Sequence, residues 1–355
     1  MNNLFTPTQL GDIELTNRFV MAPMTRSRAT AEGDLVTDLH VEYYRQRASA
    51  GLIISEGTQP SKNGKGYCRT PGIYNDAQIA AWKKVTDAVH EAGGRIVCQI
   101  MHVGRVASHL NKDADAETVA PSAITAQGEI FTEQGMKPLD PPRALTLNEI
   151  AEVIEEFRQA AANAMAAGFD GVELHCTSGY LPAQFLATGS NQRNDNYGGS
   201  VENRCRFPLE VLAAMANEIG VAKVGFRICP GHPFNDLHDD NPKETFAYFL
   251  SNAAKLGLAY LHVIRMPATG LNNIDIARQY YGGPLILNES YDAAEADTAI
   301  ASGEGEAVSF GRPFIANPDF VARVQNGQAL ADMNVKTLYI DGPVGYVDYP
   351  PAGDN

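Results

Sequence analysis

Short apolar runs rich in strand-forming residues alternate along the chain with longer segments in which apolar residues recur every three or four positions. The short runs predict eight strands, at residues 19–24, 51–58, 95–102, 171–176, 223–230, 260–264, 284–290 and 307–313. The periodic segments predict helices, among them residues 76–92, 147–167, 200–219, 242–256 and 291–302. Strands that alternate with helices form parallel sheets, and eight such units close a barrel. The pattern therefore predicts an α/β protein with one (β/α)8 TIM barrel.

One segment interrupts this rhythm. Residues 106–144 contain many turn-forming residues and few apolar runs. Long insertions between regular elements are commonly functional, and this one follows the third predicted strand. We expect it to form a capping subdomain over part of the barrel top. The length of 355 residues falls within the usual range for one barrel, so we expect a single domain from residue 1 to 355.

The composition disfavours several kinds of partner. The net charge is −14 and the 28 Lys and Arg residues form no dense run, so we expect no binding to nucleic acid. No stretch of about 18 apolar residues occurs, so we expect no membrane span, and the first residues do not match a targeting segment. The five Cys residues form no CxxC pair, which indicates free thiols in a reducing cytoplasm.

Polar residues stand at the C-terminal ends of the predicted strands, where TIM barrels place their active sites. The eighth strand ends in Gly311 and Arg312, a glycine that allows close backbone approach and a forked cation, so this pair predicts a phosphate site. Any one of these polar side chains could simply satisfy backbone groups, but their convergence on one rim favours a functional site. The other exit residues are Pro23, Met24, Thr25, Gly57, Gln99, His175, Arg227, Asn288 and Ser290.

The strand within residues 168–206 carries the strongest local signal. Glu173 and His175 alternate with apolar residues, so they share one face of the strand, and His175 reaches the rim. We expect Glu173 to lie inside the barrel, paired with a cation such as Arg227. Cys176 should point away from His175 because successive side chains of a strand alternate, which favours a structural thiol.

Taken together, these segments resemble the old yellow enzyme family of FMN-dependent ene reductases, and the likeness covers almost the whole chain. Its carriers are MAPMTRSRA, EYYRQRASAGLIISEGTQ, QIMHVGR, GFDGVELH, SNQRNDNYGGSVENRCRF and FGRPFIANPDFVARV, which begin at residues 21, 42, 99, 168, 190 and 310. Similar motifs occur in the bacterial members that reduce pentaerythritol nitrates, N-ethylmaleimide and cyclohexenones. The resemblance implies non-covalent FMN, NADPH or NADH as reductant, and electron-poor alkenes as small-molecule substrates.

The resemblance also assigns cofactor roles to the strand exits. Thr25 would hydrogen-bond the flavin near its reactive edge, Gln99 would bind the pyrimidine edge, and Arg227 would stabilise the anionic reduced flavin. Gly57 would leave room for the ring. Glu289 beside the phosphate would be repulsive unless its side chain turned away. The remaining residues implied to contact the cofactor are Pro23, Met24, His175, Asn288, Ser290, Gly311 and Arg312.

The catalytic groups follow from the same resemblance. His175 would donate a hydrogen bond to the substrate carbonyl or nitro oxygen, so that hydride from flavin N5 adds to the β-carbon. Tyr180 would protonate the α-carbon from the opposite face. Ser178 stands where relatives have Asn or a second His, so we expect it to be a weaker second anchor for the substrate oxygen. Walls of the substrate pocket would be Tyr67, Met101, Phe234 and Tyr346.

Two other functions stay open at this point. A retaining glycoside hydrolase would need Glu173 and Glu289 as facing carboxylates about 5 Å apart, but the single Trp offers little for sugar stacking. A flavin-binding barrel with weak or atypical turnover is the second alternative, because of Ser178. No histidine spacing matches a metal site, so no metal is expected. The sequence favours NADPH over NADH only by family habit and leaves open whether the protein is a monomer or a small homo-oligomer.

Overall fold

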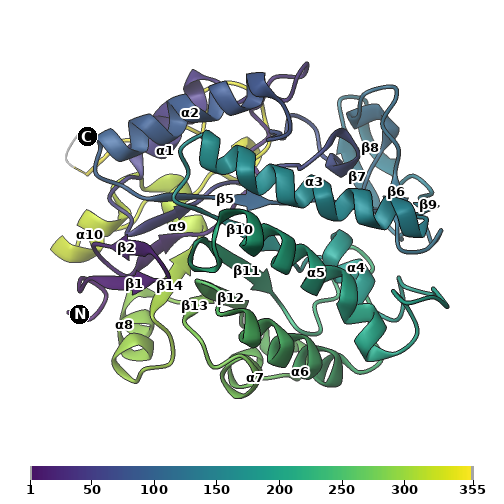
Figure 1. Ribbon diagram of the computed structural model, residues 1–355. Helices are drawn as coiled ribbons and strands as arrows, with labels where there is room; N and C mark the ends of the chain where they lie inside the picture. Colours follow the sequence, from purple (N-terminus) through teal and green to yellow (C-terminus); the bar gives the residue numbers. More distant parts are fainter. Residues whose placement is uncertain (1, 353–355) are drawn as a thin grey trace.

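A closed barrel of eight parallel strands forms the centre of the computed structural model, which describes residues 2–352 (Figure 1). The predicted (β/α)8 barrel is therefore confirmed, and each predicted run contains one barrel strand. β12 has the predicted bounds, and the other strands are shorter than their predicted runs, mostly because the last residues of each run leave the sheet and enter the loops of the barrel top. In chain order they are β3 (Phe19–Met21), β4 (Leu52–Ile54), β5 (Ile96–Ile100), β10 (Gly171–His175), β11 (Val224–Ile228), β12 (Tyr260–Ile264), β13 (Leu285–Asn288) and β14 (Ala307–Phe310).

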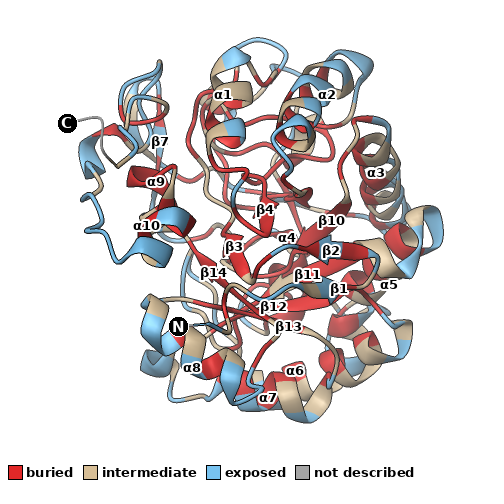
Figure 2. Ribbon diagram, turned by 90° about the vertical axis from the view of Figure 1, so that its left-hand side faces the viewer, coloured by how far each residue is buried: buried red, intermediate tan, exposed pale blue. Residues whose placement is uncertain are grey.

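Helices surround the barrel and connect its strands. Those predicted from periodicity are α2 (Asp76–Glu91), α3 (Leu147–Ala166), α5 (Val201–Ile219), α6 (Pro242–Ala253) and α8 (Ala293–Ala301), and the chain also forms α1 (Asp38–Gln46), α4 (Leu181–Leu186) and α7 (Asn273–Tyr280). Their inward faces and the strands are buried, as Figure 2 shows in red. Cys176 is buried in this outer core, on the side opposite His175 as predicted. Within residues 2–352, no helix combines the length and the apolar character needed to span a bilayer.

A hairpin at the start of the chain closes the N-terminal end of the barrel. Gly11 turns the hairpin with φ 60°, where a Cβ atom would lie 2.1 Å from the carbonyl oxygen of Ala222. Apolar side chains of the hairpin are buried together with those that point into this end of the barrel, so no room is left there for a polar site. The two strands are β1 (Thr8–Leu10) and β2 (Ile13–Leu15).

The segment predicted as an excursion follows β5 and forms a second hairpin at the edge of the barrel top (Figure 1). Alternate residues of its first strand are buried, and Ile130 packs with Met101 and Tyr180. Arg69 holds the hairpin by an ion pair with Glu133 and also donates to the carbonyl of Ser27. The strands are β6 (Val119–Ala120), β7 (Glu129–Thr132), β8 (Gly135–Pro138) and β9 (Arg143–Ala144), of which β7 and β8 pair antiparallel.

After β14 the chain forms α9 (Arg312–Ala316) and α10 (Phe320–Asn326) and then returns to the barrel top without regular strands. Two buried arginines hold this returning segment. Arg26 donates to the carbonyls of Leu338 and Gly345, and Arg28 donates to those of Thr337, Leu338, Gly342 and Val344. An arginine carries five N–H donors, so two of them can fix a segment that has no ladder of its own.

Candidate active site

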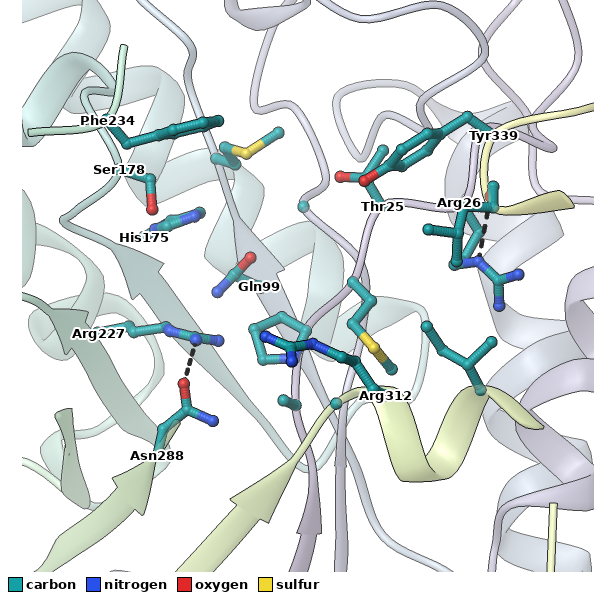
Figure 3. A pocket seen from close by; sticks show the side chains of 18 of the residues that line it. Thr25, Arg26, Gln99, His175, Ser178, Arg227, Phe234, Asn288, Arg312 and Tyr339 are labelled. Carbon is teal, nitrogen blue, oxygen red and sulfur yellow. Dashed lines mark hydrogen bonds between the residues drawn. The ribbon is translucent and has the colours of Figure 1, made fainter. Parts of the chain in front are cut away.

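A cavity of about 970 Å³ lies at the C-terminal end of the barrel (Figure 3). The structure brings to it every predicted site residue except one. These are Pro23, Met24, Thr25, Gly57, Tyr67, Gln99, Met101, His175, Ser178, Tyr180, Arg227, Phe234, Asn288, Ser290, Gly311 and Arg312.

The exception is Tyr346, whose prediction as a pocket wall is wrong. Its side chain is fully buried and stacks on Tyr43 with ring centroids 4.0 Å apart. The guanidinium groups of Arg26 and Arg28 lie over the same ring. Because these arginines bind the backbone on both sides of Tyr339, the returning segment presents Leu338 and Tyr339 to the cavity instead.

Several lining residues had no signal in the sequence. Ser309 and Asn235 line the floor and the rim, Phe131 comes from the hairpin, and Tyr339 comes from the returning segment. The alternation of polar and apolar residues in β7 could have shown which of its side chains point inward, had these residues been predicted to form a strand. The place of Tyr339 depends on long-range hydrogen bonds, which no local pattern reports.

Arg227 supplies the fixed positive charge of the cavity floor. Its Nη2 donates to Asn288 Oδ1 at 2.6 Å, and its Nε has no hydrogen-bond partner within residues 2–352 (Figure 3). Burial lowers the pKa of Arg227 from its ordinary value, and an arginine remains a cation at neutral pH. The cavity can therefore stabilise an anionic group held at this edge.

Glu173 lies inside the barrel as predicted, but its direct partner is not Arg227. Its carboxylate accepts a hydrogen bond from Gln99 Nε2 at 2.8 Å and lies 2.9 Å from His262 Nδ1. Burial alone would raise the pKa of Glu173, but its hydrogen bonds with His262 and Gln99 and the charge of Arg227 hold it below its usual value. This carboxylate does not line the cavity, so a hydrolase that uses it as a facing acid is excluded.

His175, Tyr180 and Tyr67 form the polar part of one wall. The rings of His175 and Tyr180 lie 4.9 Å apart, and the hydroxyls of Tyr180 and Tyr67 are 3.1 Å apart. Burial, followed by the charge of Arg227, lowers the pKa of His175 well below its ordinary value. Burial raises the pKa of Tyr180 well above 10. At neutral pH the wall therefore carries a neutral imidazole and a protonated phenol.

Ser178 stands in a left-handed backbone conformation, with φ 57°. Its carbonyl oxygen accepts a hydrogen bond from Asn235 Nδ2 at 2.8 Å. The next residue is Gly179, where a Cβ atom would lie 2.7 Å from that of Asn235. The two loops after β10 and β11 are therefore in contact, and the Ser178 hydroxyl faces the cavity near His175 (Figure 3).

At the opposite end of the cavity Arg312 is 73% exposed. Glu289 does not turn away from it, because its Oε1 accepts hydrogen bonds from Arg312 Nη2 at 3.2 Å and from the Ser290 hydroxyl at 2.8 Å. Arg265 donates to the carbonyls of Glu289 and Ser290, which holds both residues in left-handed conformations. A phosphate at Arg312 would thus compete with the Glu289 carboxylate.

These features fit a flavin mononucleotide. Glycine at position 57 lets the Met101 side chain pack against the backbone of the cavity wall, since a Cβ atom there would lie 2.6 Å from Met101 Sδ. Gln99 and Arg227 offer an acceptor and donors for the edge of a polar ring, and Arg312 offers an exposed cation for a phosphate. The fold and the cavity together define a TIM-barrel oxidoreductase that works with a bound flavin.

A family model described as the NADH:flavin oxidoreductase / NADH oxidase family matches residues 3–331, and the chain belongs to this family. A protein of Leishmania infantum named as a probable flavin mononucleotide-dependent alkene reductase is 43% identical, over 98% of this chain and 97% of that protein. Morphinone reductase in complex with tetrahydroNAD superposes with a TM-score of 0.93 at 45% identity, covering 99% of this chain and 98% of that chain. The old yellow enzyme homologue from Zymomonas mobilis superposes with a TM-score of 0.94 at 39% identity, covering 98% of this chain and 99% of that chain.

Glu56, directly before Gly57, is a buried carboxyl group next to this site. It accepts a hydrogen bond from the backbone N–H of Arg26 at 3.3 Å and lies 3.5 Å from His40 Nε2. Burial raises the pKa of Glu56 to about 7. The unfolded chain therefore releases this proton at lower pH than the folded protein, and folding stability falls as the pH rises from about 4.5 to 7.

We predict that Glu56→Gln removes the loss of folding stability that Glu56 causes as the pH rises. Relative to wild type, the variant should gain about 3 kcal/mol of unfolding free energy between pH 4.5 and pH 7.5, because the amide has no proton to release. Urea unfolding at the two pH values measures the difference. Glu14→Gln, at an exposed position, serves as control and should show no such gain. An equal effect of Glu56→Gln at both pH values would contradict the prediction.

Proposed function

We propose that the protein reduces the activated C=C bond of α,β-unsaturated carbonyl or nitro compounds, with FMN as cofactor and NADH or NADPH as reductant. The observation that carries the proposal is one cavity with a half-buried cation at its floor, an exposed cation at one end, and a neutral imidazole beside a phenol on its wall. FMN, when bound, supplies the transfer of hydride from the nicotinamide to the alkene. The names of the relatives, an alkene reductase and morphinone reductase, support it.

His175 polarises the substrate in this proposal. Its Nδ1 is buried without a hydrogen-bond partner within residues 2–352, so we place the imidazole proton on Nε2. A neutral imidazole donates this proton as a hydrogen bond without transferring it. The bond to a carbonyl or nitro oxygen withdraws electrons from the conjugated alkene and prepares its β-carbon for hydride.

Tyr180 supplies the proton. Because burial keeps its pKa high, the phenol is fully protonated when the substrate needs an acid. Tyr67 contacts the Tyr180 hydroxyl and orients it, and both rings are held by the apolar contacts of the hairpin. The acid and the hydrogen-bond donor thus come from one wall, five residues apart in the chain.

Arg227, Gln99 and Arg312 hold the cofactor in this proposal. The half-buried Arg227 stabilises negative charge at the floor, and Arg312 binds the phosphate after release from Glu289. The substrates are small electron-poor alkenes. We also infer a cytoplasmic location, since all five cysteines are free and buried, and a monomer or small homo-oligomer.

Anaerobic stopped-flow spectroscopy tests the function. The purified protein, supplied with FMN, should be yellow, should bleach on mixing with NADH or NADPH, and should recover its colour on mixing with an enone, nitroalkene or maleimide. The relative rates with the two nicotinamides give the preferred reductant. A protein that bleaches but is not reoxidised by any of these alkenes would contradict alkene reduction and leave only flavin binding.

We predict that Tyr180→Phe slows reoxidation by an enone by about 100- to 10,000-fold, because a positioned acid is lost. Reduction of the flavin by the nicotinamide should stay near the wild-type rate. Nitroalkenes should be affected less, since their nitronate products can gain a proton from water. Tyr67→Phe is the matched control, which leaves the acid in place and should cost much less. Equal losses in both half-reactions would assign Tyr180 to binding.

We predict that Ser178→Asn lowers the KM for cyclohexenone by about two- to tenfold, since one net hydrogen bond contributes roughly 0.5–1.5 kcal/mol. Asn accepts the left-handed conformation of residue 178 more readily than most residues, so the backbone should not change. Maleimides, which have a second carbonyl, should change less. Steady-state kinetics beside His175→Ala measures this, and an unchanged or higher KM for the enone would contradict a second anchor at this position.

A further inference from the structure

A chain of four buried side chains crosses the barrel directly beneath the cavity. Gln99 on β5 donates to Glu173 on β10 at 2.8 Å, Glu173 lies 2.9 Å from His262 Nδ1 on β12, and His262 Nε2 lies 2.7 Å from the Ser309 hydroxyl on β14. All four are at most 3% exposed. Gln99 and Ser309 line the cavity, whereas Glu173 and His262 do not. This series of hydrogen-bonded side chains therefore starts and ends at the cofactor site.

The carboxylate decides the direction of every bond in this chain. An ionised Glu173 can only accept, so Gln99 must give it an N–H and His262 must carry its proton on Nδ1. The Nε2 atom of the neutral His262 ring is then an acceptor, and the Ser309 hydroxyl donates to it at 2.7 Å rather than to the carbonyl of Leu287 at 3.4 Å. As a result, Gln99 Oε1 and the Ser309 oxygen are left as acceptors, and both residues line the cavity. An imide N–H, such as that of the flavin pyrimidine ring, is the kind of group that the acceptor on Gln99 recognises.

Glycine at position 225 makes the crossing possible. Glu173 pairs in register with Gly225 on β11, the strand that separates β10 from β12. A Cβ atom at Gly225 would lie 2.3 Å from the ring of Tyr260. With no side chain there, the Tyr260 ring fills that space and Glu173 reaches His262 beyond it.

The charges that face Glu173 are those of Arg227 and, when protonated, His262. Burial lowers the pKa of His262, so the imidazole is neutral at neutral pH. Two fixed charges therefore remain beneath the cavity, the Glu173 anion and the Arg227 cation. The anion offsets part of the field with which Arg227 attracts electrons to a bound ring.

We propose that Glu173 is a positioning residue for the flavin, which fixes Gln99 and Ser309 as acceptors on two sides of the cavity and lowers the reduction potential of the flavin by opposing Arg227. His262 extends this hydrogen-bonded series across the barrel to Ser309 and thereby orients the Ser309 hydroxyl. The inference rests on the proposed flavin-dependent function. It concerns a carboxylate that touches neither substrate nor cofactor and acts through the residues that do.

The experiment compares Glu173→Gln with Glu173→Asp, measuring the Kd of oxidised FMN and the reduction potential by dye equilibration. In Glu173→Gln the neutral amide can donate to Gln99 and turn its N–H groups toward the cavity. Oxidised FMN should bind more weakly, and its Kd should rise about tenfold more than that of reduced FMN. That tenfold difference equals a potential about 30 mV higher for a two-electron couple. Glu173→Asp keeps the charge but shortens the side chain, so it should weaken FMN binding without raising the potential.

His262→Gln and Glu156→Gln complete the set. His262→Gln keeps the carboxylate but breaks the path to Ser309, so its FMN affinity should fall and its potential should not rise. Glu156, a half-buried carboxyl group on α3 away from the cavity, is the matched control, and its replacement by Gln should change neither quantity.

An unchanged or lower potential in Glu173→Gln that still binds FMN would overturn the proposal, and so would an equal rise in Glu173→Asp. If Glu173→Gln does not fold, the test rests on His262→Gln. A raised flavin potential in His262→Gln, or a wild-type affinity for FMN, would then overturn the proposal. Failure of the wild-type protein to bind FMN would overturn the proposed function itself, so the two failures are distinguishable.

Discussion

The closure of eight parallel strands into one barrel is the constraint on which the rest of this protein depends. Parallel strands all end on the same side, so closure brings their last residues to a common rim. His175 pairs in register with Arg227, and Arg227 hydrogen-bonds Asn288, although these residues lie on three strands far apart in the chain. Apolar side chains fill the other end of the barrel and leave the polar groups only one end at which to gather.

A charged side chain buried at the C-terminal end of the barrel needs hydrogen-bond partners or an opposite charge, and these partners join side chains from different strands into one network. Arg227 is a half-buried cation close to the buried Glu173 anion, and the anion in turn orients an amide and an imidazole. The arginines beneath the returning segment are satisfied differently, mainly by backbone carbonyls. In both places a buried charge organises its surroundings through hydrogen bonds that only one arrangement can satisfy.

The site divides its tasks between rigid and less regular parts of the chain. The groups assigned to chemistry stand at or just beyond strand ends, where the barrel fixes their positions. The mouth is formed by loops, with Phe131 from the hairpin, Phe234 from the loop after β11 and Tyr339 from the returning segment. Loops tolerate change more readily than strands do. These loops can therefore differ without moving the groups that stand on the strands.

The sequence by itself determined the barrel, its strands and nearly all lining residues at the strand exits, because alternation and helical periodicity are local signals and the rule that exits form the site is general. It also placed Glu173 inside the barrel. Only the tertiary structure decided that Glu173 pairs with His262 rather than Arg227, that Glu289 turns toward Arg312, and that Tyr339 rather than Tyr346 reaches the cavity. Each of these depends on hydrogen bonds between segments far apart in the chain, and the geometry of such contacts is set by packing and not by neighbouring residues.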